Sequence, residues 1–89
     1  MTWKIEIKPT AERYYLRLDK KTRKRIKQAL MELENAENPL LNRNVRALTG
    51  KLQGDYRLRV GGFRILFTPN KKKKIIQVFA VLPRGNAYS

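Results

Sequence analysis

The segment Gly54-Asp-Tyr-Arg-Leu-Arg-Val-Gly-Gly-Phe-Arg-Ile-Leu-Phe67 decides the fold of this chain, because it has the pattern of a β-hairpin. Apolar and polar residues alternate on both sides of Gly61-Gly62, and a glycine pair suits a tight two-residue turn. A turn at these glycines fixes how the two strands pair. The expected pairs are Val60 with Phe63, Arg59 with Arg64, Leu58 with Ile65, and Tyr56 with Phe67.

The two faces of this hairpin differ in character. The face expected to enter the core is wholly apolar and consists of Tyr56, Leu58, Val60, Phe63, Ile65 and Phe67. The other face has Arg59 across from Arg64, with Arg57 two residues away on the same side. Like charges opposed across a ladder cost up to about 1 kcal/mol, so this arrangement indicates an anionic ligand. The alternative is a solvated sheet whose arginines only point into water.

The charge of the whole chain supports an anionic ligand. The 89 residues are expected to form one domain, and they include 21 Lys and Arg against 7 Asp and Glu, a formal charge of +14. Residues 1–38 hold ten bases and six acids, whereas residues 39–89 hold eleven bases and only Asp55. The second part is therefore expected to face the anion, and phosphate is the anion that we expect.

The residue types that are missing exclude several classes of site. The chain has no cysteine and no histidine, so it forms no disulfide and no zinc module, and its seven scattered carboxylates predict no magnesium cluster. We therefore expect neither a metal nor a cofactor. The start Met1-Thr-Trp-Lys lacks the apolar region of a signal peptide, and no segment reaches membrane-spanning length. These features favour a cytoplasmic protein with no membrane contact.

The remaining pattern predicts an α+β fold. Thr2–Lys8 alternates like a half-buried strand that Pro9 ends, and Thr10 is expected to cap a short helix. Asp19 is expected to cap a longer helix over Lys20–Asn35, and Asn38-Pro39 to close it.

Residues 39–53 are expected to be mostly irregular, with Val45 and Leu48 anchoring the loop. After the hairpin, Pro69-Asn70 turns into Lys71–Lys74, and an apolar strand follows over Ile75–Leu82. The order is β-α-α-β-β-β, in which a two-helix hairpin packs on one face of a small, mainly antiparallel four-stranded sheet. The arginine face is then left open.

The topology also brings in the C-terminal residues. The last strand is expected to run antiparallel to Phe63–Thr68, so its C-terminal end lies beside the start of that strand. Arg84 and Tyr88 should therefore arrive near Arg64 and Arg59.

At this point the sequence resembles a known family. The pattern from Gly50 to Phe67, followed by an apolar strand and the closing Arg84-Gly-Asn-Ala-Tyr88, is similar to the RelE/ParE superfamily of bacterial and archaeal toxins. The resemblance spans residues 1–89 as a single RelE-like toxin domain. RelE-like members cut messenger RNA in the ribosomal A site, and ParE-like members poison DNA gyrase. The terminal Arg84 and Tyr88 resemble the RelE-like nuclease branch more closely.

The resemblance implies roles for individual residues. The family's catalytic arginine or lysine positions fall on Arg57, Arg59, Arg64 and Arg84, and its stacking tyrosine falls on Tyr88. The implied reaction is metal-free: the ribose 2′-hydroxyl attacks the adjacent phosphate and leaves a 2′,3′-cyclic phosphate. Arginines suit the stabilisation of such a phosphorane, because a guanidinium forks onto two phosphate oxygens.

The general base is left open by the sequence. Related enzymes often use a lysine, a histidine or a glutamate, whereas this chain has arginine at both positions of the first hairpin strand, and arginine stays protonated. Lys51 is a candidate base, and Asp55 and the Tyr88 phenol are weaker ones.

The basic runs of the chain have two interpretations each. The four residues Lys71, Lys72, Lys73 and Lys74 are candidates for binding the RNA backbone, and the alternative is a solvated loop. The cluster at residues 20–27 is either the wet face of the long helix or a contact with ribosomal RNA.

Three functions therefore stay open. The favoured one is an endoribonuclease toxin that acts on ribosome-bound messenger RNA and is silenced by a cognate acidic antitoxin. The second is a ParE-like toxin that inhibits DNA gyrase, and the third is a small RNA- or ribosome-binding protein without catalysis. In each case an apolar groove beside the helix pair, or an exposed sheet edge, could receive a partner's helix or strand.

Overall fold

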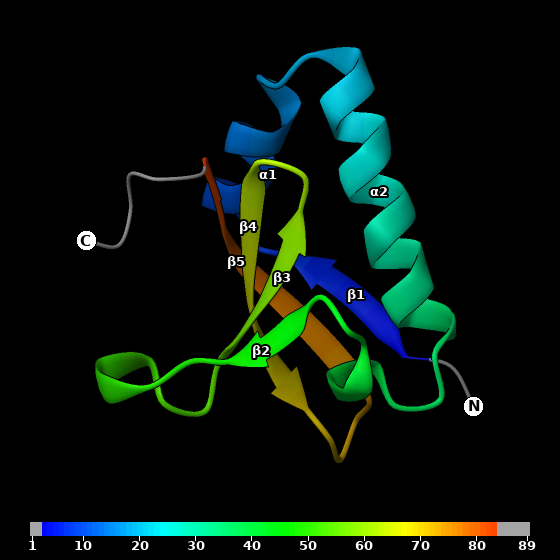
Figure 1. Ribbon diagram of the computed structural model, residues 1–89, viewed down its shortest axis with the longest axis vertical. Coiled ribbons are helices and arrows are strands. Elements are labelled where there is room, and N and C mark those ends of the chain that lie inside the picture. The colour runs from blue at the N-terminus through cyan, green and yellow to red at the C-terminus, as the bar shows by residue number, and fades with distance from the viewer. Residues whose placement is uncertain (1–2, 84–89) are drawn as a thin grey trace.

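The computed structural model describes residues 3–83 and has two helices packed against a five-stranded sheet (Figure 1). The elements, in chain order, are β1 (Lys4–Ile7), α1 (Pro9–Leu16), α2 (Lys20–Asn35), the 3-10 turn η1 (Pro39–Leu41), β2 (Val45–Ala47), the 3-10 turn η2 (Gly50–Leu52), β3 (Tyr56–Val60), β4 (Phe63–Asn70) and β5 (Ile75–Pro83). The α+β class and the overall order of elements are confirmed.

The sheet has the strand order β1-β5-β4-β3-β2, and only the pair of β1 with β5 is parallel. The sheet is mainly antiparallel, as the sequence predicts, but it has five strands where four were expected. The additional strand is β2, a three-residue edge strand in the segment that was expected to be irregular. Val45 is buried, which confirms its expected anchoring role, while Leu48 is only half-buried.

The central hairpin pairs as the sequence predicts. All four expected pairs are present across β3 and β4, including Arg59 with Arg64. Gly61 has φ +55°, a left-handed conformation that glycine adopts at no steric cost. The turn therefore fixes the register, and the register sends alternate side chains to opposite faces.

The hydrophobic core lies between α2 and one face of the sheet. Ile26 and Leu33 of α2 are fully buried, as are Ile65 and Phe67 of β4. Phe67 also stacks on Tyr56, with ring centroids 5.9 Å apart. Because this apolar face is covered by the helix layer, the hairpin arginines occupy the opposite face of the sheet.

The two helices begin differently. Asp19 caps α2 as predicted: its carboxylate accepts hydrogen bonds from the Thr22 backbone N–H at 3.1 Å and from the Thr22 hydroxyl at 2.6 Å. The expected Thr10 cap of α1 is wrong. Pro9 is already the first helical residue and Lys8 precedes it, because the fixed φ of proline suits the first position of a helix.

Within residues 3–83, neither helix is both long enough and apolar enough to cross a lipid bilayer.

Candidate nucleic-acid interface

Three of the predicted site residues lie together on the face of the sheet that the helices do not cover. Arg57 and Arg59 are two residues apart on β3, and Arg64 lies directly across from Arg59 on β4. Arg59 is exposed, while Arg57 and Arg64 are half-buried. The hairpin alone therefore presents three guanidinium groups to one side of the molecule.

Strand β2 adds a cation that the sequence analysis missed. Arg46 lies directly across from Arg57, so a second pair of like charges stands beside the Arg59 and Arg64 pair. The Nη1 of Arg46 donates to the backbone carbonyls of Arg43 and Val45, each at 3.3 Å. These contacts hold its guanidinium near the edge of the sheet.

Two hollows flank Arg59 on this part of the surface. The first, of about 340 Å³, is lined by Arg59, Gly61, Gly62, Phe63 and Arg64 at the hairpin turn. The second, of about 200 Å³, is lined by Arg43, Asn44, Arg46, Arg57 and Arg59. Among the described residues that line either hollow there is no aspartate or glutamate. Both hollows are therefore suited to oxyanions such as phosphate.

Helix α2 places a further cation at the turn. A Cβ added at Gly61 would lie only 3.1 Å from Nη2 of Arg25, and 3.3 Å from both its Cζ and its Nη1. The Arg25 guanidinium therefore lies close to Gly61, which lines the first hollow. From the sequence, Arg25 belongs to a cluster that is either the wet face of the helix or a contact with ribosomal RNA. Its place at the turn is not among these expectations, because no sequence pattern relates Arg25 to a turn 36 residues later.

The predicted residues Arg84 and Tyr88 lie outside the described residues. The strand that leads to them does run as predicted, since Leu82 pairs with Arg64 and Pro83 pairs with Phe63. The end of β5 thus lies beside the start of β4.

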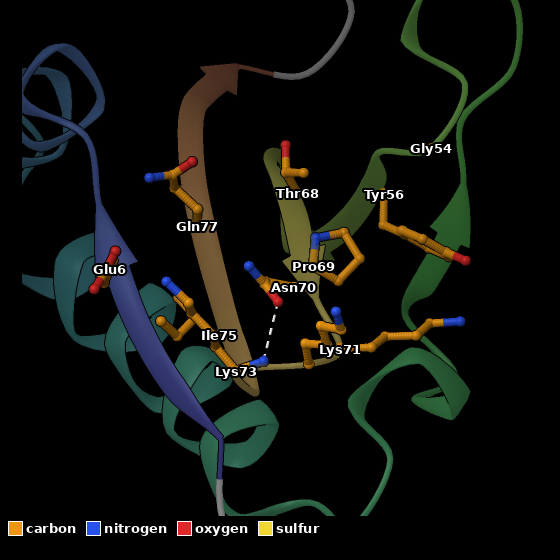
Figure 2. Close-up of a pocket in the computed structure, with 11 residues that line it drawn as sticks. Glu6, Gly54, Tyr56, Thr68, Pro69, Asn70, Lys71, Lys73, Ile75 and Gln77 are labelled. Atoms are coloured by element: carbon orange, nitrogen blue, oxygen red, sulfur yellow. Dashed lines mark hydrogen bonds between the residues drawn. The ribbon is translucent and has the colours of Figure 1, made fainter.

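The predicted backbone-binding lysines do not join the arginines. Lys71–Lys74 follow the far end of β4, and at about 3.4 Å per residue that end lies about 20 Å from Arg64. Figure 2 shows Lys71 and Lys73 at this turn, where the Lys73 N–H donates to Oδ1 of Asn70 at 3.0 Å. They line a separate cavity of about 840 Å³.

This cavity draws residues from four strands, as the labelled side chains in Figure 2 show. Its described lining residues are Glu6, Gly54, Tyr56, Thr68, Pro69, Asn70, Lys71, Lys72, Lys73, Ile75 and Gln77. Glu6 and three lysines line this cavity, whereas no described residue that lines the arginine hollows is a carboxylate. The lysine turn and the arginine hollows are therefore distinct surfaces.

The candidate bases also lie apart from the arginine hollows. Lys51 is exposed in η2, before the end of β3 that is remote from the Gly61 turn, and it lines neither hollow. Asp55 accepts a hydrogen bond from the Thr68 hydroxyl at 2.7 Å. The structure therefore does not bring either residue into the arginine hollows.

Comparison with known proteins relates this architecture to toxins. The family described as "ParE toxin of type II toxin-antitoxin system, parDE" matches residues 5–88. No curated protein sequence matches the chain.

Solved structures match over nearly the whole chain. The archaeal RelE–RelB complex from Pyrococcus horikoshii OT3 has a chain with a TM-score of 0.79 and 29% identity, covering 98% of this chain and 100% of that one. The RelB–RelE antitoxin–toxin complex from Methanococcus jannaschii gives a TM-score of 0.70 and 26% identity, with 88% of each chain covered. The YoeB/ParE toxin from Agrobacterium tumefaciens gives a TM-score of 0.75 at 14% identity, covering 92% of this chain and 99% of that one.

The last of these matches shows a shared fold alone, because its identity is low. The family match carries more, since it extends over residues 5–88 and so covers almost the entire sequence. The chain therefore belongs to the RelE/ParE superfamily of toxins from type II toxin–antitoxin systems.

Proposed function

We propose that this toxin is a metal-independent endoribonuclease that cleaves messenger RNA on the ribosome. The observation that carries the proposal is the convergence of Arg57, Arg59 and Arg64 on the uncovered face of the sheet, around hollows whose described lining contains no carboxylate. Such a face attracts the RNA backbone, and its guanidinium groups fork onto phosphate oxygens.

In the proposed reaction, the ribose 2′-oxygen attacks the adjacent phosphorus and the bond from phosphorus to the 5′-oxygen breaks. The products are a 2′,3′-cyclic phosphate and a 5′-hydroxyl. Negative charge builds on the phosphorane, and Arg59 and Arg64 would stabilise it together with Arg57. We propose the same role for Arg84, and stacking on an unpaired base for Tyr88.

The 2′-hydroxyl must lose a proton, and the leaving 5′-oxygen must gain one. Arginine stays protonated, so the residues lining the hollows do not supply the base. We propose Lys51 for this role, which requires η2 and the bound RNA to approach one another.

The remaining parts of the proposal concern location and partners. We propose that residues 1–89 act as one toxin domain in the cytoplasm, where Lys71–Lys74 add affinity for the RNA backbone without sequence preference. An acidic antitoxin is the proposed protein partner. Two of the similar structures are RelE–RelB complexes, and a charge of +14 favours an acidic partner.

A second candidate target is DNA gyrase. The observation that favours it is the matched family itself, which is described as the ParE toxin of parDE systems. The two candidates share the fold and differ in whether the arginine face acts on RNA.

Purified toxin incubated with translating ribosomes tests the proposal. We expect cuts within the translated message whose 5′ fragments end in a 2′,3′-cyclic phosphate. The Arg64→Ala variant should cleave about 100-fold more slowly, because one charge-stabilising group at the phosphorane is lost. The matched control is Arg13→Ala, which makes the same change at an exposed position on α1.

A supercoiling assay with purified gyrase, run in parallel, separates the two candidates. Inhibition of gyrase by a toxin that leaves messages intact would replace the nuclease proposal with the gyrase one. Equal cleavage by the Arg64→Ala and Arg13→Ala variants would show that the arginine face is not the catalytic surface.

A further inference from the structure

The second hollow contributes Arg57 and Arg59 to the single-phosphate chemistry described above, but its other two arginines, Arg43 and Arg46, have no role in that chemistry. Among the described residues, the second hollow shares Arg59 with the first hollow and no other lining residue. Arg43 and Arg46 line it from β2 and from the segment just before β2, on the side of β3 away from Arg64. Two adjacent hollows rich in guanidinium groups thus lie on either side of one shared arginine.

Hydrogen bonds of the backbone hold in place the segment that lines the second hollow. Oδ1 of Asn42 accepts a hydrogen bond from the Asn44 N–H at 2.8 Å, and its carbonyl oxygen accepts one from the Val45 N–H at 3.0 Å. The Asn44 carbonyl in turn accepts a hydrogen bond from the Arg59 N–H at 2.9 Å. These bonds fasten the segment that carries Arg43 directly to the strand that carries Arg59.

The side chain of Arg46 is also held in place. Its Nη1 bonds to the carbonyls of Arg43 and Val45, which leaves the remaining guanidinium N–H groups to meet a ligand. Arg46 and Arg57 oppose each other across the ladder, so this hollow has two positive charges on adjacent strands. The lining offers hydrogen-bond donors and positive charge, which suit an oxyanion.

We propose that Arg43 and Arg46 form a second phosphate subsite, which holds the phosphate next to the scissile one on a single RNA strand. This inference rests on the proposed function, because it takes the hollow at Arg59 and Arg64 as the place of the scissile phosphate. A single strand carries phosphates in a regular series, so adjacent hollows that share Arg59 can seat consecutive ones. The shortest RNA that engages both hollows is then a trinucleotide with two phosphates.

Binding of short RNAs tests the subsite without any need for cleavage. The probes are a dinucleotide with one phosphate and a trinucleotide with two, both 2′-O-methylated so that they cannot be cut. Each competes with a labelled octanucleotide in a fluorescence anisotropy measurement. The Arg46→Gln variant removes the positive charge and leaves a shorter side chain that still carries a neutral amide donor, and circular dichroism checks its fold.

We expect Arg46→Gln to weaken binding of the trinucleotide about tenfold, the loss for one charge-assisted hydrogen bond, and to leave the dinucleotide unchanged. The octanucleotide should also lose about 0.7 from its slope of log K against log salt. Arg43→Gln should act in the same direction, and Arg13→Gln, the same change at an exposed position on α1, should change neither quantity.

Three outcomes would overturn the subsite: an equal loss for both probes, no loss for either, or a loss of binding to a glutamate-rich peptide with the trinucleotide unaffected. The last result would assign the hollow to a protein partner. A failure of the proposed nuclease activity is a separate result. In that case the toxin would not cleave RNA, but Arg46→Gln would still weaken binding of the trinucleotide and not of the dinucleotide.

Discussion

Gly61 is the residue at which the turn, the helix layer and the arginine face meet. Its φ of +55° is a conformation that costs other residues about 1–2 kcal/mol. The Arg25 guanidinium also occupies the space into which a Cβ would project. The glycine is therefore required for two independent reasons, one in the backbone and one in the contact with α2.

The Gly61→Ala variant should lower the free energy of unfolding by about 1–2 kcal/mol for the backbone strain alone, with a further loss from the contact with Arg25. Urea unfolding followed by circular dichroism measures the total.

Gly50→Ala is the matched control for this variant. Gly50 also has a positive φ, of +70°, but nothing lies within 4 Å of its added Cβ. The Gly61 variant should therefore be the more destabilised of the two, and adding Arg25→Ala should remove the difference. An equal decrease in the free energy of unfolding for both glycine variants would show that the Arg25 side chain moves aside without cost.

At the scale of elements, the sequence predicted correctly the features that depend on residues close together in the chain. The hairpin register follows from one glycine pair and strict alternation, so every expected pair of β3 with β4 is confirmed. The range of α2 follows from its apolar stripe and the Asp19 cap, and it too is confirmed. In both cases the deciding signals lie within the element itself.

The elements that were missed depend on tertiary pairing. Strand β2 has only three residues, Val45–Ala47, and its extended form comes from the hydrogen bonds along β3 rather than from any alternation of its own. Arg46 therefore looked like a loop residue, and its place opposite Arg57 could not be inferred. The shift in register between β4 and β5 at Leu66 and Phe67 is likewise absent from the expectations.

The cap of α2 predicts a dependence of stability on pH. The hydrogen bonds from the side chain and then the backbone of Thr22 hold the pKa of Asp19 below its ordinary value of 3.8. A carboxyl group whose pKa is lowered by folding stabilises the folded state fully above its unfolded value. That stabilisation is lost as the pH falls from 3.8 through the lowered folded value.

The Asp19→Ala variant should therefore melt at a lower temperature than the parent protein at neutral pH, and this gap should narrow as the pH falls below 3.8. Thermal unfolding across a pH series measures the gap. Glu32→Ala, which removes the same charge from an exposed position within α2, is the matched control. A gap for Asp19→Ala that stays constant across the series would contradict the role of the ionised cap.

At the scale of the whole molecule, charge density is the dominant feature. A formal charge of +14 is carried by a chain whose Cα radius of gyration is 12.3 Å. The sequence predicted the excess in the second half of the chain, and the fold concentrates part of it on the face of β2, β3 and β4. The first half of the chain also contributes to the charge near this face, because α2 places the Arg25 guanidinium beside the turn at Gly61.

Salt should stabilise the protein, because the Debye length falls from about 10 Å at 0.1 M to about 3 Å at 1 M and self-repulsion falls with it. We expect the melting temperature to rise by several degrees between low and high sodium chloride concentration. Differential scanning fluorimetry measures the shift, with sucrose as an uncharged comparison. A melting temperature that is flat or falls with sodium chloride would show that bound partners or local pairs already neutralise the charge.

The pairing of β1 with β5 has a consequence for the order of events during synthesis. Lys4 pairs with Ile75, so the first strand of the sheet has no neighbour until 71 further residues have been made. Strand β5 lies between β1 and β4 in the sheet. The sheet therefore cannot close around its central strands until β5 has left the ribosome, so its longest-range pairing forms only after most of the described residues have been made.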